Sequence, residues 1–280
     1  MLEQIYWTPD YLGMKSIPQR FWQKEQGRVS VPDDMVNFKG PLYRRVTTAK
    51  TFPEFANRQE ELFNHIFDFT FGILDERGAR QVFSSTCGKE ASSPLYSLGA
   101  DFGKQIGDPS LRDFSQPDGF FVAEDWVLGV EIKFNASTSL DQIAKYILAF
   151  ATEYAFSQQS KKYSLLYISP RPEKLLTEHL EKCGGQFVCP GFEVLLNGAK
   201  NSIKGRLEEK KTPIHYVLSN LQIVSISWQD FALALQSYLE RYCGTDVPNL
   251  THQKLVQGLI HEIFKHPHSG ILSSRMGNAT

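Results

Sequence analysis

The chain has 280 residues, of which 41% are hydrophobic and 22% are charged, so it can bury a sizeable core. Thirty basic and thirty-one acidic residues give a formal charge of −1, which excludes a strong overall attraction to nucleic acid and leaves only local patches for polyanions. The N-terminus lacks a basic region followed by a long apolar one, and the most apolar segment, IAKYILAFATEYAF, is too short to span a bilayer. We therefore expect a cytoplasmic protein with no membrane partner.

The first part of the chain predicts an arm, a helix and a short strand. Residues 1–55 mix prolines with aromatic residues, a pattern typical of short elements and turns, and we interpret them as an N-terminal arm. Apolar residues at helical spacing predict a core helix over 57–77 that ends before Gly78. The run RQVFSS (80–85) predicts a strand, and the glycine-rich segment 86–115 predicts an irregular region or lid where substrate contacts are expected.

The rest of the chain alternates strands with helices. Two β-rich runs, 120–122 and 126–134, flank an acidic turn and predict a hairpin. Apolar periodicity predicts a helix over 137–156, and the apolar run 163–169 predicts a strand. From 57 to 169 the predicted order is helix, three strands, helix and strand. Beyond it we expect a helix near 172–183, a β-prone FEVLL segment, a strand over 221–227, a helix over 228–242 and a last helix over 251–265.

These elements predict an α/β protein with a mixed central sheet flanked by helices. We divide it into an N-terminal arm (1–55), a core domain (56–230) and a C-terminal helical extension (231–280). The cysteines at 87, 183, 189 and 243 show no C-x-x-C spacing, so free thiols are favoured over a zinc site. The three histidines near the C-terminus have no acidic or cysteine partner at fixed spacing, so a surface role is favoured for His261, His266 and His268.

Three charged residues of the hairpin are the main functional candidates. Because side chains alternate along a strand, Glu131 and Lys133 share one side while Val130 and Ile132 point to the other, into the core. The turn at 123–125 brings Asp118 alongside Glu131. Two carboxylates beside an ammonium suit Mg²⁺, which binds oxygen through one or two carboxylates and completes its shell with water and substrate phosphate. The alternative is an exposed hairpin face that carries an ordinary Glu and Lys pair.

Asp118, Glu131 and Lys133 stand in the pattern PD…EIK within the order of elements over 57–169, and this pattern resembles the PD-(D/E)XK nuclease superfamily. The resemblance implies a restriction-endonuclease-like core in which Asp118, Glu131 and the Ile132 carbonyl bind Mg²⁺, or Mn²⁺, while Lys133 assists the attacking water. It implies a nuclease that hydrolyses phosphodiester bonds of nucleic acid, DNA favoured, and by analogy a possible homodimer. A catalytically inactive module of the same fold that binds nucleic acid or protein is one alternative, and an unrelated α/β protein with an accidental motif is another.

Further site residues follow from the same resemblance. Many members carry a glutamate on the first core helix, and helical geometry places Glu60 at the edge of the apolar stripe and Glu61 on its far side, so we assign the role to Glu60. An ordinary surface role for both is the alternative. Gln142 and Tyr146 match the Q-x-x-x-Y feature of one branch and lie one helical turn apart. Ser139 and Gln142 also fit a capping box, so both roles stay open for Gln142.

Segment 200–211 is the remaining candidate for contact with phosphates. It contains five basic residues, Lys200, Lys204, Arg206, Lys210 and Lys211. Acidic residues are interspersed with them, and such mixed-charge loops are usually solvated. We interpret the segment as a solvated loop, with nucleic-acid contact as the alternative.

Overall fold

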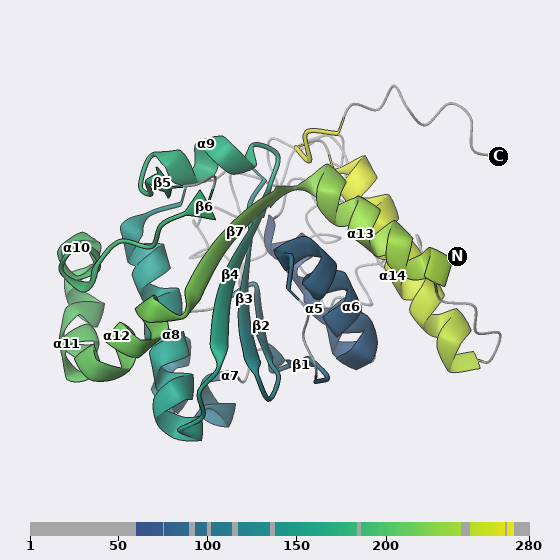
Figure 1. Ribbon diagram of the computed structural model, residues 1–280. Coiled ribbons are helices and arrows are strands. Elements are labelled where there is room, and N and C mark those ends of the chain that lie inside the picture. The colour runs from purple at the N-terminus through teal and green to yellow at the C-terminus, as the bar shows by residue number, and fades with distance from the viewer. Residues whose placement is uncertain are drawn as a thin grey trace, which may run out of the picture.

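The computed structural model describes residues 60–74, 76–89, 93–99, 102–113, 117–134, 138–183, 186–241, 247–266 and 268–271 (Figure 1). The predicted N-terminal arm, residues 1–55, lies outside these ranges. The helices are α5 (Glu60–Ile73), α6 (Glu76–Cys87), α7 (Phe102–Gln105), η3 (Pro109–Asp113), α8 (Leu140–Ser157), α9 (Pro172–Thr177), α10 (Phe192–Gly198), α11 (Asn201–Glu209), α12 (Lys211–Ser219), α13 (Trp228–Arg241) and α14 (Val247–Lys265). The strands are β1 (Tyr96–Ser97), β2 (Gly119–Val122), β3 (Trp126–Ile132), β4 (Lys162–Ser169), β5 (Lys182–Cys183), β6 (Gln186–Phe187) and β7 (Leu221–Ser227).

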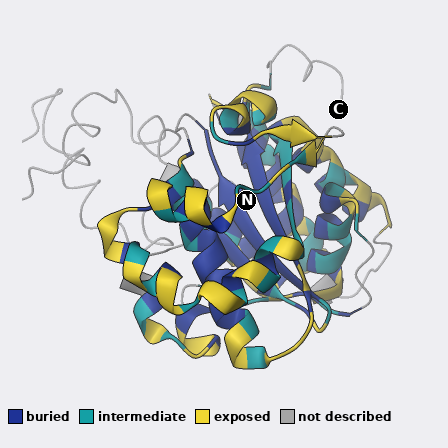
Figure 2. Cartoon of the chain, turned by 60° about the vertical axis from the view of Figure 1, so that its left-hand side comes forward, coloured by how far each residue is buried: buried dark blue, intermediate teal, exposed yellow. Residues whose placement is uncertain are grey.

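In the described ranges the strands form one seven-stranded mixed sheet in the order β1-β2-β3-β4-β7-β6-β5. The three central strands β3, β4 and β7 are parallel, whereas β1 and β2 on one edge and β6 and β5 on the other are antiparallel to their neighbours. Parallel strands are normally covered on both faces, and all seven residues of β3 are buried, as Figure 2 shows for the centre of the sheet. The predicted α/β fold with a mixed, helix-flanked sheet is confirmed.

Two apolar layers sandwich the sheet. Helices α5, α6, α13 and α14 cover one face, and α8 with α10, α11 and α12 covers the other (Figure 1). Alternation along β3 divides its side chains, since Val130 and Ile132 enter the first layer and Val127 enters the second. Glu131, between Val130 and Ile132 in sequence, therefore faces the α8 side.

The first helix and strand of the prediction are partly wrong. The chain forms two helices where one was expected, and residues 80–85 lie inside α6, not in a strand. Gly78 does not end a helix. A Cβ atom at Gly78 would lie 2.8 Å from the Tyr238 hydroxyl, so glycine here permits close packing of α6 against α13. Strand β1 lies further along the chain, inside the segment expected to be irregular, and α7 and η3 separate it from β2. The predicted order of elements therefore holds from β2 onward, as β2, β3, α8 and β4.

Two segments beyond β4 also differ from the prediction. The β-prone FEVLL segment is helix α10, and residues 200–211 form α11 and the start of α12, not a loop. In α11 the apolar residues Ile203 and Leu207 are buried at helical spacing. In α10 Phe192 and Leu195 are buried in the same layer, and this packing outweighs the strand propensity of FEVLL. Helix α9 ends at Thr177, and the short strand β5 follows it. The hairpin, α8, β4, β7, α13 and α14 appear where expected, within a few residues.

Helices α13 and α14 contribute to the same apolar layer as α5 and α6. The division into a core domain and a C-terminal extension at residue 230 stays a prediction.

Cys87, Cys183 and Cys189 are free thiols, as expected. The surface role predicted for His266 is wrong, because its side chain is buried, whereas His268 is exposed. Among the described residues no helix has the length and apolar character needed to cross a bilayer.

Candidate active site

The hairpin places Asp118 beside the end of β3. Asp118 immediately precedes β2, and the pairing of Gly119 with Val130 puts Asp118 in the position opposite Glu131. One carboxylate oxygen of Asp118, Oδ2, accepts a hydrogen bond from the Ile132 amide at 2.7 Å. The other, Oδ1, accepts one from the side-chain amide of Asn64 on α5 at 2.5 Å. The hairpin therefore brings Asp118 alongside Glu131 as predicted, and two donors fix the orientation of the Asp118 carboxylate.

Glu131 is buried among donors. Only 2% of Glu131 and 9% of Lys133 is exposed, and the Lys133 ammonium lies 2.5 Å from Glu131 Oε1. The Tyr146 hydroxyl lies 2.7 Å from Oε2, and the Gln142 side-chain amide donates to Oε1. An exposed Glu and Lys pair on a solvated hairpin face, the alternative interpretation of this motif, does not describe these side chains.

The start of α8 explains how Gln142 reaches Glu131. Ser139 is the N-cap, and its hydroxyl accepts a hydrogen bond from the Gln142 backbone amide at 3.2 Å, as expected for the first half of a capping box. The side-chain amide of Gln142 donates to the carboxylate of Glu131 on β3. Of the two roles considered for Gln142, this contact is the one that bears on the candidate site. Tyr146 follows one turn later on the same flank of the helix.

A glycine in β3 lets the Tyr146 ring approach the strand. A Cβ atom at Gly129 would lie 2.7 Å from the Tyr146 ring, so any larger residue would displace it. The hydroxyl at the far end of the ring lies 2.6 Å from the Val130 carbonyl oxygen and within reach of Glu131. Burial raises the pKa of Tyr146 well above its usual range, and the charges of Glu131 and Asp118 raise it further. The phenol consequently keeps its proton and acts as a donor to the carboxylate.

A second tyrosine lies beside this cluster on β4. The strand register places Tyr167 next to Glu131. Its hydroxyl lies 3.2 Å from the Thr138 hydroxyl, and Thr138 in turn lies 3.5 Å from the Gln142 side-chain oxygen. Burial first, and then the charge of Glu131, raise the pKa of Tyr167. The Glu131 carboxylate therefore has neutral hydroxyl and amide groups and one ammonium beside it on the α8 side, with the Asp118 carboxylate opposite.

Aromatic stacking holds the end of β3 in place. The Phe134 ring lies between Trp228, at a centroid distance of 4.5 Å, and His266, at 3.5 Å. The Trp228 indole N–H donates to the Lys133 carbonyl oxygen at 3.1 Å, and the Lys133 amide donates to Ile168 at 2.9 Å. The backbone that carries Lys133 is thus fixed on both sides.

The contact between α5 and Asp118 involves a residue that the sequence did not indicate. Glu60 is the first residue of α5, and its side chain lies outside the described part of the structure, so its assigned role stays a prediction. Asn64, one turn further along the same flank, donates to Asp118. Its side-chain oxygen is buried and has no hydrogen-bond partner among the residues that the structure describes. An uncharged amide gives little sequence signal, and only its spacing of four from Glu60 pointed to this flank.

The available ligands are oxygen atoms. In a strand the N–H and C=O of one residue point to the same side, so the Ile132 carbonyl lies on the edge where its amide meets Asp118. Among the described residues no three His, Cys, Asp or Glu side chains gather into a group that could hold a metal ion. Two carboxylates and a backbone carbonyl are nevertheless a donor set of the kind that Mg²⁺ accepts, since it usually keeps several waters.

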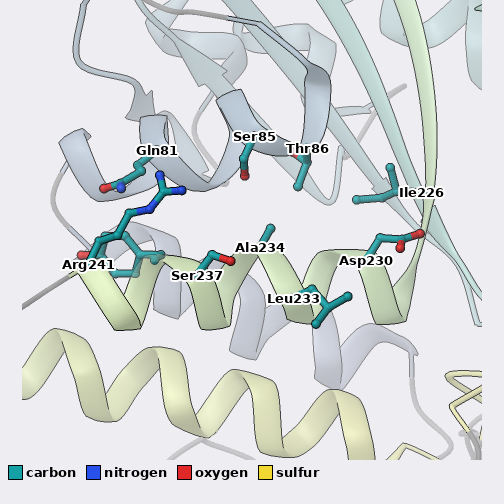
Figure 3. A pocket seen from close by; sticks show the side chains of 10 residues that line it. Gln81, Ser85, Thr86, Ile226, Asp230, Leu233, Ala234, Ser237 and Arg241 are labelled. Atoms are coloured by element: carbon teal, nitrogen blue, oxygen red, sulfur yellow. The ribbon is translucent and has the colours of Figure 1, made fainter.

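A separate cavity of about 350 Å³ lies between α6 and α13 (Figure 3). Ser85 and Thr86 line it from α6, and Ala234 and Ser237 face them from α13. Arg241 extends toward Gln81 at one end. This cavity is lined by different residues from the cluster around Asp118 and Glu131, so we treat it as distinct from the candidate active site.

Comparison of the chain with models of protein families, with curated proteins and with solved structures finds no match to any of them, so the assignment of this site rests on its geometry.

Proposed function

We propose that this protein is a Mg²⁺-dependent nuclease with a restriction-endonuclease-like core, acting on phosphodiester bonds of nucleic acid and most readily of DNA. One observation carries the proposal: Asp118 lies opposite Glu131, bonded to the amide of Ile132, with Lys133 buried against the same glutamate. The order of β1, β2, β3, α8 and β4 around this point supports the resemblance to the PD-(D/E)XK superfamily.

Each residue has a chemical task in this proposal. Asp118, Glu131 and the Ile132 carbonyl would hold the cation. When bound, the cation would stabilise charge on the phosphate and make water more acidic. Asn64 and the Ile132 amide orient Asp118, while Tyr146 and Gln142 orient Glu131. Lys133 supplies a positive charge where negative charge accumulates on the phosphate in the transition state.

A non-catalytic module of the same fold that binds nucleic acid or protein is the second candidate. The observation that favours it is the completeness of the existing contacts. Both oxygens of Asp118 accept hydrogen bonds, and Glu131 already has Lys133, Tyr146 and Gln142 as partners. A buried ion pair satisfied in this way can serve as a structural element.

Cleavage assays with matched variants separate the two candidates. Purified full-length protein is incubated with plasmid, single-stranded DNA and RNA in Mg²⁺, Mn²⁺ or EDTA, beside Asp118→Ala and Lys133→Ala. Glu124→Ala is the control, because it removes an exposed carboxylate from the turn of the same hairpin. We expect cleavage that requires the metal, is lost in both site variants and survives in the control.

Three other results would decide against nuclease activity at this site. Binding of nucleic acid that persists in EDTA, with no cleavage under any condition, would support the non-catalytic module. Cleavage that survives Asp118→Ala would show that the activity comes from another site or from a contaminant. Protein that neither binds nor cuts would leave the α/β fold without the proposed function.

A further inference from the structure

Ser169 is the last residue of β4 and lies at the same end of the sheet as the candidate active site. Ser169 is 2% exposed, and within the described part of the chain its hydroxyl has no hydrogen-bond partner. A buried hydroxyl without a partner is costly, so such a group calls for an explanation. The buried hydroxyl of Ser164, near the opposite end of the same strand, by contrast accepts the Trp126 indole N–H at 3.0 Å.

The strand register places Ser169 beside Lys133. Strands β3 and β4 are parallel, with Ile132 paired to Ile168, so the next pair is Lys133 and Ser169. The bond from the Lys133 amide to the Ile168 carbonyl continues this register past the end of β3. Ile132 and Ile168 both enter the α5 side of the core. The side chains that follow them in each strand therefore share the opposite, α8 side.

Lys133 has a partner that it would have to share with a cation. Its ammonium lies 2.5 Å from Glu131 Oε1, the oxygen that also accepts from Gln142. A divalent cation at Glu131 would repel this ammonium and compete for the same carboxylate. Lysine has a flexible stem and a compact charge, so it can change partner within a short distance. Neighbouring strands are only about 4.8 Å apart, which places Ser169 within reach.

We infer that Ser169 is a positioning residue that receives the Lys133 ammonium when a divalent cation takes over Glu131. In the structure described here Lys133 occupies its resting position on Glu131. In the loaded state its ammonium donates to the Ser169 hydroxyl, which holds the positive charge beside the cation and next to the phosphate. This inference rests on the proposed function, since the cation is what displaces Lys133.

The first test compares two serine variants of β4 in the full-length protein. We expect Ser169→Ala to lower kcat for DNA cleavage about tenfold to a hundredfold with little change in KM, because a hydrogen bond to a charged group is lost only in the loaded state. Its melting temperature should equal or exceed that of the wild type, since the hydroxyl removed has no partner. Ser164→Ala, the control, should keep kcat and lose stability, because it deprives Trp126 of its acceptor.

The second test is a crystal structure of the full-length protein with Ca²⁺, which shares the oxygen preference of Mg²⁺. We expect Ca²⁺ at Asp118 and Glu131 and the Lys133 ammonium within hydrogen-bond distance of Ser169. Ca²⁺ bound there with Lys133 still on Glu131, or Ser169→Ala with wild-type kcat, would overturn the role of Ser169 alone. No Ca²⁺ at the two carboxylates, together with wild-type protein that does not cleave, would overturn the proposed function. It would also remove the cation that is proposed to displace Lys133 from Glu131.

Discussion

The α8 side of the sheet contains two buried clusters of glutamate, lysine and tyrosine, one at each end. At one end Glu153 accepts from Lys161 at 2.9 Å and from the Tyr163 hydroxyl at 3.2 Å. At the other, Glu131 accepts from Lys133 and Tyr146. Both ion pairs are almost inaccessible to solvent. The exposed fraction of the side chain is 5% for Lys161 and 3% for Glu153. It is 11% for Lys133 and 3% for Glu131.

What distinguishes the two clusters is their surroundings. Asp118 lies opposite Glu131. Buried atoms that find no hydrogen-bond partner among the described residues, such as Asn64 Oδ1 and Ser169 Oγ, belong to residues near that end of the sheet. Around Glu153 the donors and acceptors described above match each other. Burial of an ion pair is therefore no sign of function by itself. A second carboxylate and unsatisfied neighbours are what make the Glu131 cluster a candidate for chemistry.

The largest expected effect is the difference in activity between Glu131→Gln and the matching substitution at Glu153. Glu131→Gln should lower DNA cleavage about a thousandfold, because it removes a proposed cation ligand and several kcal/mol of transition-state stabilisation. Glu153→Gln should leave the rate per folded molecule near that of the wild type. Initial rates in Mg²⁺, measured well below the melting temperature of each variant, test this difference. Equal losses of activity in the two variants would remove the functional distinction between the clusters.

Stability should show the structural nature of the Glu153 cluster. Lys161→Met leaves Glu153 buried without its cation, and we expect a loss of about 3 kcal/mol in the free energy of unfolding. The double variant Glu153→Leu with Lys161→Met should recover most of this loss, because apolar groups then replace the whole ion pair. Urea unfolding monitored by circular dichroism measures both. A double variant no more stable than Lys161→Met would contradict this account of the pair.

A smaller effect is expected at His266, a buried imidazole outside both clusters. Burial lowers the pKa of His266 from 6.5 to about 3, so the folded protein disfavours its charged form. The unfolded chain takes up a proton near pH 6.5, and the stability contributed by neutral His266 is present above that pH and is lost as the pH falls toward 3. His266→Phe keeps a ring against Phe134 and should weaken this acid sensitivity.

We compare the free energy of unfolding of His266→Phe with that of the wild type. As the pH falls from 7.5 to 4.5, we expect this difference to shift by about 2 kcal/mol in favour of the variant, a value reduced to allow for partial solvent access. Urea unfolding at the two pH values provides the measurement. A stability difference that stays constant with pH would mean that His266 has the same pKa in the folded protein and in the unfolded chain.

Sequence patterns predicted the elements that combine strong periodicity with a clear boundary. Strand β7 has the expected bounds, α8 begins at its serine cap, and the hairpin follows from two β-rich runs around an acidic turn. The failures have physical causes. Gly78 resembles a helix stop until Tyr238, far away in sequence, is found packed against it. The FEVLL segment has strand propensity, yet its packing against the neighbouring helices decides in favour of α10.

The candidate site also contains residues that the sequence predicted and residues that it did not. Local spacing was enough to bring Asp118 to Glu131 and to place Lys133 on the same side, because a hairpin fixes all three positions. Asn64 and Ser169 required the packing of α5 and the register of β4, which join segments far apart in the chain. Such residues carry no motif, and only the three-dimensional arrangement brings them to notice.

Gly129 shows how a residue without a side chain can determine where the side chain of another residue lies. The missing methyl group leaves a notch in β3 that the Tyr146 ring fills, and only at this depth does the phenol meet the carboxylate two residues further along the strand. Mutational scans that pass over glycines would overlook this dependence. A single added carbon here would displace the Tyr146 ring and so disturb a hydrogen bond to Glu131 that Gly129 itself does not make.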